Sequence, residues 1–182
     1  MNHFFSKSLR LVDKIVASSL LKENEDFVRL THYVWLVLIA APISLYFAYY
    51  NYTIKEFFLT FIIIFFASSL ILSLFLVKHA KNIIFIYHTM NVVFILFIVT
   101  MIFMGGEEGS RILWAYTYPL ASIFLFGSRI GSFWSLVLLS AISFIFYTSP
   151  WAHEVYSSSF QLRFFVTYLC ALSITNWIEH YR

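Results

Sequence analysis

Six long apolar runs constrain the fold of this chain more strongly than any motif in it. They cover residues 28–51, 56–77, 82–104, 111–127, 130–149 and 160–180. Each is close to the roughly 20 residues that an α-helix needs to cross the hydrocarbon core of a bilayer. The loops between the runs are short, which favours packing between helices that follow one another along the chain. The sequence therefore predicts an all-α integral membrane protein with six transmembrane helices in an up-down bundle.

The composition supports this class. Hydrophobic residues make up 61% of the chain and aromatic residues 21%, and the 12% of charged residues lie in short clusters between the apolar runs. Such values lie far outside the range of soluble globular proteins, so we expect the lipid bilayer as a partner and expect no nucleic-acid binding. The single cysteine, Cys170, lies inside an apolar run. It excludes both a disulfide framework and a metal cluster built on cysteines.

Lysine and arginine residues predict the orientation of the chain, because cytoplasmic loops of membrane proteins carry an excess of them. With the N-terminus in the cytoplasm, nine of the twelve lie on the cytoplasmic side: Lys7, Arg10, Lys14, Lys22, Arg29, Lys78, Lys81, Arg129 and Arg182. The other three lie on the opposite side: Lys55, Arg111 and Arg163. This asymmetry, together with six spans, predicts that both termini are cytoplasmic.

Residues 1–27 precede the first span and carry a different pattern. Between residues 6 and 24, apolar side chains such as Leu9, Val12 and Val16 line one helical stripe, with lysines away from it. This pattern is typical of an amphipathic helix that lies on the cytoplasmic leaflet near anionic headgroups. A helix packed under the bundle or against a partner chain is the alternative.

Motifs for catalysis are absent from the sequence. Acidic residues of the predicted spans lie only at their ends, at Glu56 and Glu179, so carboxylate proton relays and acidic metal sites are not expected. The chain also lacks a His-Glu-x-x-His zinc motif, a Gly-x-Ser-x-Gly nucleophile turn and a glycine-rich phosphate loop. We therefore expect that the chain itself is not an enzyme.

Two histidines stand out in the predicted spans. His32 lies about one turn inside the first span and His88 about six residues inside the third, so both imidazoles are expected at a similar depth. Two such histidines are the minimum for six-coordinate haem b, whose iron takes one axial ligand from each side. Basic residues near the cytoplasmic surface would then hold the propionates: Arg29, Lys78, Lys81 and Arg129. The alternative is a polar contact between helices, for which Asn91 lies one turn beyond His88.

Residues 105–114 form a glycine-rich acidic turn between the third and fourth runs. Four side chains of this turn are candidates for lining an outward-facing ligand pocket: Glu107, Glu108, Arg111 and Trp114. A kink at Pro119 would open such a pocket. The alternative is structural: the glycines end one helix, Gly109 and Ser110 begin the next, and the tryptophan anchors the membrane interface.

The region from Met101 to Trp134 carries a longer pattern. It contains GG-x-E-G-S-x-x-LW from Gly105, then Tyr-Pro-Leu, and then a short G-x-R-x-G turn that ends at Gly131. This pattern resembles the MASE-like membrane sensor regions at the N-termini of bacterial diguanylate cyclases, and related regions of some membrane histidine kinases. The resemblance covers residues 105–131 in detail and the remaining chain only in the number of spans.

The resemblance implies a signal-input domain in the bacterial cytoplasmic (inner) membrane. Such a domain would sense a redox, gas or small-molecule cue and pass it through the sixth helix to a cytoplasmic GGDEF-type output domain that makes cyclic di-GMP. Residues 181–182 would begin a truncated signalling helix, and the chain would form a parallel homodimer. Two other classes remain open: a cytochrome-b-like electron carrier that uses the same histidines, and a small transporter or assembly subunit.

Overall fold

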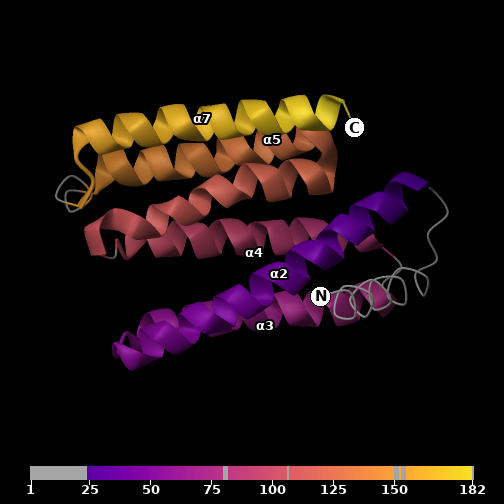
Figure 1. Ribbon diagram of the computed structural model, residues 1–182, viewed down its shortest axis with the longest axis horizontal. Helices are drawn as coiled ribbons and strands as arrows, with labels where there is room; N and C mark the ends of the chain where they lie inside the picture. Colours follow the sequence, from indigo (N-terminus) through magenta and orange to yellow (C-terminus); the bar gives the residue numbers. More distant parts are fainter. Residues whose placement is uncertain (1–23, 80–81, 106, 150–151, 153–154, 182) are drawn as a thin grey trace, which may run out of the picture. The chain divides into compact units, whose positions relative to one another are not determined.

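A computed structural model describes residues 24–79, 82–105, 107–149, 152 and 155–181. Every regular element in these residues is a helix, which confirms the all-α prediction (Figure 1). In chain order the helices are α2 (Asn24–Thr53), α3 (Phe57–His79), α4 (Ile83–Phe103), η1 (Glu107–Tyr116), α5 (Thr117–Thr148) and α7 (Ser158–His180). The amphipathic helix predicted within residues 1–27 lies largely outside the described residues.

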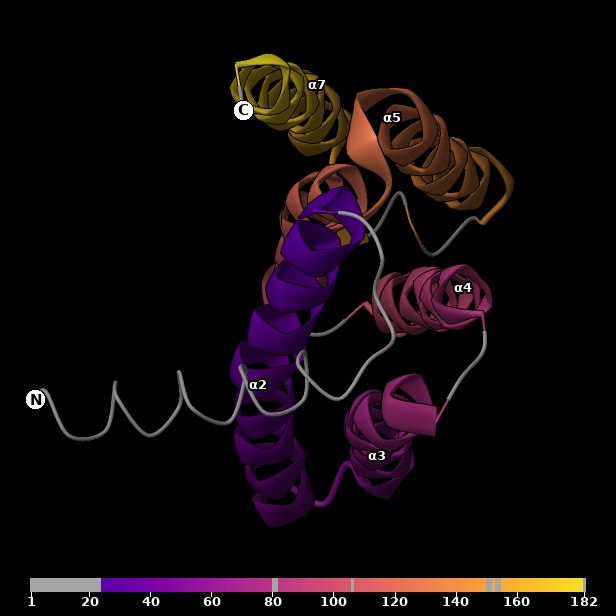
Figure 2. The same cartoon turned by 90° about the vertical axis from the view of Figure 1, so that its right-hand side faces the viewer.

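The chain divides into two units, and the first ends at Val93, within α4. Its main contact is the long pairing of α2 with α3 (Figures 1 and 2). The turn between them is tight: Lys55 has a left-handed φ of 65°, and the Glu56 N–H donates to the Asn51 carbonyl at 3.0 Å. Buried side chains of α3 recur every three or four residues: Leu59, Ile63, Phe66, Leu70, Ser73 and Val77. Such a stripe is typical of a helix that faces its neighbours on one side only.

The second unit begins at Phe94 and contains the end of α4, η1, α5 and α7. Within α5 the backbone leaves the helical conformation at Gly127, where φ is 78° and ψ is 171°. The Ser122 hydroxyl donates to the carbonyl of Gly131 at 3.0 Å, whereas residues nine positions apart in a straight helix are separated by about 13.5 Å. The chain therefore reverses at Gly127, so that α5 consists of two arms, residues 117–126 and 128–148 (Figure 1).

The helix α7 packs along α5 (Figures 1 and 2). Its buried side chains form a single stripe: Phe164, Tyr168, Leu172 and Thr175. The Ser157 hydroxyl caps the N-terminus of α7 by accepting the Phe160 N–H at 3.3 Å. A serine at this position satisfies one of the N–H groups that have no partner within the helix.

Four segments of the described chain are long and apolar enough to cross a membrane: Val28–Thr53, Phe57–His79, Ile83–Phe103 and Gly109–Thr148. The last has 40 residues, and at about 1.5 Å per residue it is twice as long as the roughly 30 Å hydrocarbon core is thick. The reversal at Gly127 divides this length. The helix α7 is not among the four segments. The structure thus supports a membrane protein with four candidate spans, a coarser result than the six spans predicted.

Large apolar side chains face outward on α3. Phe57, Phe61 and Phe65 lie four residues apart and are 60–68% exposed. Soluble monomers rarely expose a continuous apolar surface of this kind, whereas lipid is a favourable environment for it. This surface agrees with the predicted contact with a bilayer.

Candidate functional site

A polar cluster joins α7 to α5 close to the reversal at Gly127. The side-chain oxygen of Asn176 accepts hydrogen bonds from the hydroxyls of Ser128 and Ser132, the second at 2.9 Å. The side-chain nitrogen of Asn176 donates to the Leu172 carbonyl at 3.0 Å. Polar side chains within apolar segments thus satisfy one another, as they do between packed membrane helices.

A second contact between the two helices lies about 12 Å along α7, at Tyr168. The side chain of Tyr168 is fully buried, and its hydroxyl donates to the Ser135 carbonyl at 3.0 Å. Neither Tyr168 nor Asn176 is predicted as a site residue from the sequence. In the sequence, the only feature that points to Tyr168 and Asn176 is a polar group within an apolar run.

Aromatic rings continue from Tyr168 to the loop between α5 and α7. We call this series the aromatic column, and it consists of Tyr168, Tyr116, Phe164, Phe146 and Tyr156. The centroids of neighbouring rings lie 5.2 to 6.5 Å apart, which is within the range of favourable aromatic pairs. The column connects the loop, η1, α5 and α7 within the second unit.

The turn that was predicted to line an outer pocket packs against Tyr156. Gly109 has a left-handed φ of 71°, and a Cβ added to it would lie 2.5 Å from Cε1 of Tyr156. Both the backbone conformation and the ring therefore require glycine here. The Tyr156 hydroxyl lies 3.4 Å from the carbonyl of Ile102, near the end of α4.

The predicted pocket residues take different positions around this turn. Arg111 Nη1 donates to the Met104 carbonyl at 3.3 Å, Trp114 is half-buried, and Glu107 and Glu108 form the start of η1. The bond from Arg111 helps to close the end of α4, because the last carbonyls of a helix have no partner within it. These contacts agree with the structural interpretation of the turn, and ligand binding there stays a prediction.

A kink was expected at Pro119. Pro119 lies in the first turn of α5, and the only non-helical backbone within that helix is at Gly127. The first turn of a helix tolerates proline, because the missing N–H would have had no partner within the helix. The change in chain direction therefore comes from the glycine and not from the proline.

Tyr156 should stay protonated to an unusually high pH. Burial raises the pKa of its hydroxyl from 10.0 to about 12, and the nearby Arg111 opposes this by favouring the anion. The folded state prefers the neutral hydroxyl of Tyr156. The contribution of this hydroxyl to the free energy of unfolding is therefore complete below pH 10 and is lost as the pH rises towards 12. The difference in tyrosinate absorbance between the wild type and Tyr156→Phe reports Tyr156 alone, and it should titrate near pH 12. A difference that titrates near pH 10 would contradict the packing described for this loop.

His32 and His88 both belong to the first unit, on α2 and α4 respectively. His32 Nδ1 lies 2.7 Å from the Val28 carbonyl oxygen. Because a carbonyl oxygen can only accept, Nδ1 is the donor in this contact. A histidine that ligates a metal through one nitrogen commonly donates the other N–H in this way. His88 is half-buried.

Two tyrosines lie beside these histidines in the sequence, and their rings form a contact between α2 and α4. The ring centroids of Tyr33 and Tyr87 are 5.1 Å apart, both rings are buried, and the Tyr33 hydroxyl donates to the Ser73 hydroxyl. Haem ligation by His32 and His88 stays a prediction.

The predicted propionate partners are divided between the units. Arg29 lies on α2 and Lys78 in the last turn of α3, both in the first unit. Arg129 belongs to the second unit, and Lys81 lies outside the described residues. Across the part of the chain that the structure describes, no group of three or more His, Cys, Asp or Glu side chains could hold a metal ion.

Haem ligation can be tested directly. If His32 and His88 are axial ligands, protein expressed with ample haem should show a Soret band, and replacing either histidine with alanine should remove or convert the low-spin spectrum. His79→Ala is the matched control, because His79 Nδ1 makes the same type of bond, 3.0 Å from the Phe75 carbonyl. A colourless wild-type protein would end the haem prediction.

No protein-family model, curated protein or solved structure matches this chain. The resemblance to MASE-like sensor regions therefore rests on the pattern within residues 105–131 and on the number of predicted spans.

Proposed function

We propose that this chain is a membrane-embedded signal-input module whose output element is α7. The observation that carries the proposal is that α5 holds α7 along a single stripe, with hydrogen bonds at Tyr168 and Asn176. The other side of α7 is largely exposed. A helix held in this way can shift as a rigid body when one of its contacts changes, as interface helices do in many switching proteins.

Within this proposal the chain crosses the membrane six times, with both termini in the cytoplasm. The reversal at Gly127 divides Gly109–Thr148 into residues 109–126 and 128–148. With about 2.0 Å per residue in the 3₁₀ part and 1.5 Å in the α-helical parts, these segments are about 31 and 32 Å long, each close to the thickness of the hydrocarbon core. The helix α7 supplies the sixth crossing. This arrangement places Lys78 and Arg129 on the same side as the basic residues of the N-terminus, in agreement with the positive-inside rule.

The input is a redox, gas or small-molecule cue, and the output is a GGDEF-type domain that follows α7 and makes cyclic di-GMP. The aromatic column supports a route for the input, because it connects the loop at Tyr156 with the α7 contact at Tyr168. Residues 105–131, which resemble the sensor regions, also contain Tyr116 of the column and Ser128 of the polar cluster. The resemblance and the contacts of α7 thus fall on the same part of the chain.

A fusion of this chain, through α7, to a GGDEF domain tests the proposal in a bacterium that lacks other diguanylate cyclases. Asn176→Leu removes the acceptor of the polar cluster at nearly constant size and should change the cyclic di-GMP level several-fold. Ser173→Leu, on the exposed side of the same helix, should leave the level close to that of the wild type. Equal cyclic di-GMP levels in the wild type and Asn176→Leu, at equal amounts of protein, would contradict an output role for α7.

The proposed output requires a parallel homodimer, because a diguanylate cyclase joins two GTP molecules between paired catalytic domains. Tyr181 follows α7 and is 74% exposed. In a Cys170→Ser background, Tyr181→Cys should therefore form disulfide-linked dimers in membranes, as detected by non-reducing electrophoresis. Phe61→Cys, exposed on α3, is the control for random collision. Monomers alone, or equal cross-linking at the two positions, would count against the dimer.

A cytochrome-b-like electron carrier is the second candidate. The bond from His32 Nδ1 to the Val28 carbonyl supports it, because a metal-ligating histidine commonly donates its other ring N–H to a backbone carbonyl. The Soret measurement described above separates it from a sensor without haem. The structure offers no comparable observation for a transporter or an assembly subunit.

A further inference from the structure

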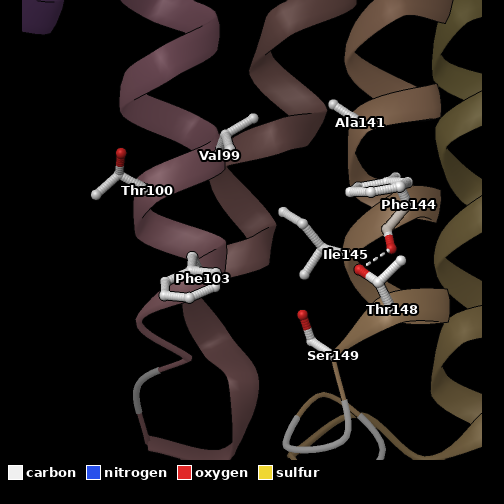
Figure 3. A pocket seen from close by; sticks show the side chains of 8 residues that line it. All are labelled: Val99, Thr100, Phe103, Ala141, Phe144, Ile145, Thr148 and Ser149. Carbon is white, nitrogen blue, oxygen red and sulfur yellow. Dashed lines mark hydrogen bonds between the residues drawn. The ribbon is translucent and has the colours of Figure 1, made fainter.

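A groove opens on the second unit between the last turns of α4 and α5. Its volume is about 480 Å³, and its walls come from Val99 and Phe103 on α4 and from Ala141, Phe144 and Ile145 on α5 (Figure 3). Phe103 and Phe144 stand on opposite walls and are 58% and 68% exposed. The groove is therefore open at its side, where a membrane helix meets lipid.

The two threonine hydroxyls of the groove are bonded to carbonyls of their own helices. The Thr100 hydroxyl donates to the Leu96 carbonyl at 2.8 Å, and the Thr148 hydroxyl donates to the Phe144 carbonyl at 2.7 Å (Figure 3). A polar ligand would lose its hydrogen bonds to water without replacement, at a considerable cost. The lining thus favours a hydrocarbon.

The length and position of the groove select one kind of hydrocarbon. From Ala141 to Ser149 the helix rises by about 12 Å, which is close to the roughly 15 Å that one leaflet contributes to a 30 Å hydrocarbon core. The groove ends at Ser149, where α5 also ends, so a hydroxyl lies at the end nearest the membrane surface. We propose that this groove binds one acyl chain of a membrane phospholipid, with the headgroup at the Ser149 end. The proposal rests on membrane insertion of the chain and is independent of a signalling role.

Photolabelling tests the proposal with the full chain in phosphatidylcholine vesicles that contain a trace of phosphatidylcholine carrying a diazirine on one acyl chain. Peptides that contain residues 99–103 and 141–149 should be labelled several-fold more than the exposed phenylalanine face of α3. Ala141→Trp places a large side chain in the groove and should reduce this labelling several-fold. Ala171→Trp, the same change at a half-buried position of α7, should not reduce it.

A second pair of variants keeps the test decisive if Ala141→Trp does not fold. Phe144→Ala removes one exposed wall of the groove and should lower the labelling, whereas Phe133→Ala, at a similarly exposed position on α5, should not. Uniform labelling of all lipid-facing peptides, or unchanged labelling in Phe144→Ala, would show ordinary contact with bulk lipid and overturn the proposal. Displacement of the probe by an isoprenoid quinone but not by excess phospholipid would overturn the choice of occupant.

Discussion

Gly131→Ala should destabilise the protein by about 3 kcal/mol, at the upper end of the usual cost of overpacking. A Cβ at this position would lie 2.5 Å from the Cα of Ile123, 2.7 Å from its nitrogen and 2.7 Å from the carbonyl oxygen of Ser122. All three atoms belong to the backbone, so no side-chain rotation can relieve the collision. The two arms of α5 would have to move apart. Unfolding of the purified protein in mixed micelles, followed by circular dichroism, measures the loss.

The sign of the stability change in Gly131→Ala tests whether the chain reverses at Gly127. In an uninterrupted helix the same glycine-to-alanine change would stabilise the protein by about 0.5–1 kcal/mol, because alanine loses less conformational entropy. Gly127→Ala is a useful comparison, since a Cβ there meets nothing within 4 Å but the φ of 78° is unfavourable for alanine. It should cost about 1–3 kcal/mol from backbone strain alone. A stabilising Gly131→Ala would contradict the hairpin described for α5.

The helices α3 and α4 could be predicted closely because length and hydropathy determine them. The predicted spans 56–77 and 82–104 correspond to α3 at Phe57–His79 and α4 at Ile83–Phe103. A helix of apolar side chains satisfies all its backbone hydrogen bonds internally, so it does not depend on distant contacts to form. The turn near Gly127 could also be expected, because two glycines within five residues follow a long apolar run.

The region of the candidate site was predicted less well. The fourth run was expected to be one helix over 111–127, whereas the structure has the 3₁₀ helix η1 over Glu107–Tyr116 followed by the first arm of α5. Contacts distant in sequence accompany this difference: the ring of Tyr156 lies on Gly109, 47 residues away by their numbers. The pairs at Tyr168 and Asn176 likewise join residues 33 to 48 positions apart. Hydropathy carries no information about such partners.

Tyr168→Ala should cost about 3–5 kcal/mol of stability, the range observed when a large buried aromatic side chain is removed. Tyr168 is fully buried and contacts the rings of Phe164 and Tyr116. The change would leave a cavity in the aromatic column and remove the hydrogen bond to Ser135, so α7 would lose its central attachment to α5. Unfolding in mixed micelles measures the stability, and limited proteolysis after Arg163 reports the release of α7.

Tyr168→Phe separates the ring from the hydroxyl. It keeps the packing and loses only the hydrogen bond to the Ser135 carbonyl, so its cost should be about 0.6 kcal/mol, the average for polar contacts between membrane helices. Tyr181→Ala, at a site that is 74% exposed, should change stability little, because no buried contact is lost. If α7 transmits a signal through this contact, Tyr168→Phe should alter the cyclic di-GMP output of the fusion while the protein remains folded. Equal stability losses in Tyr168→Ala and Tyr181→Ala would mean that the aromatic column does not hold α7 in place.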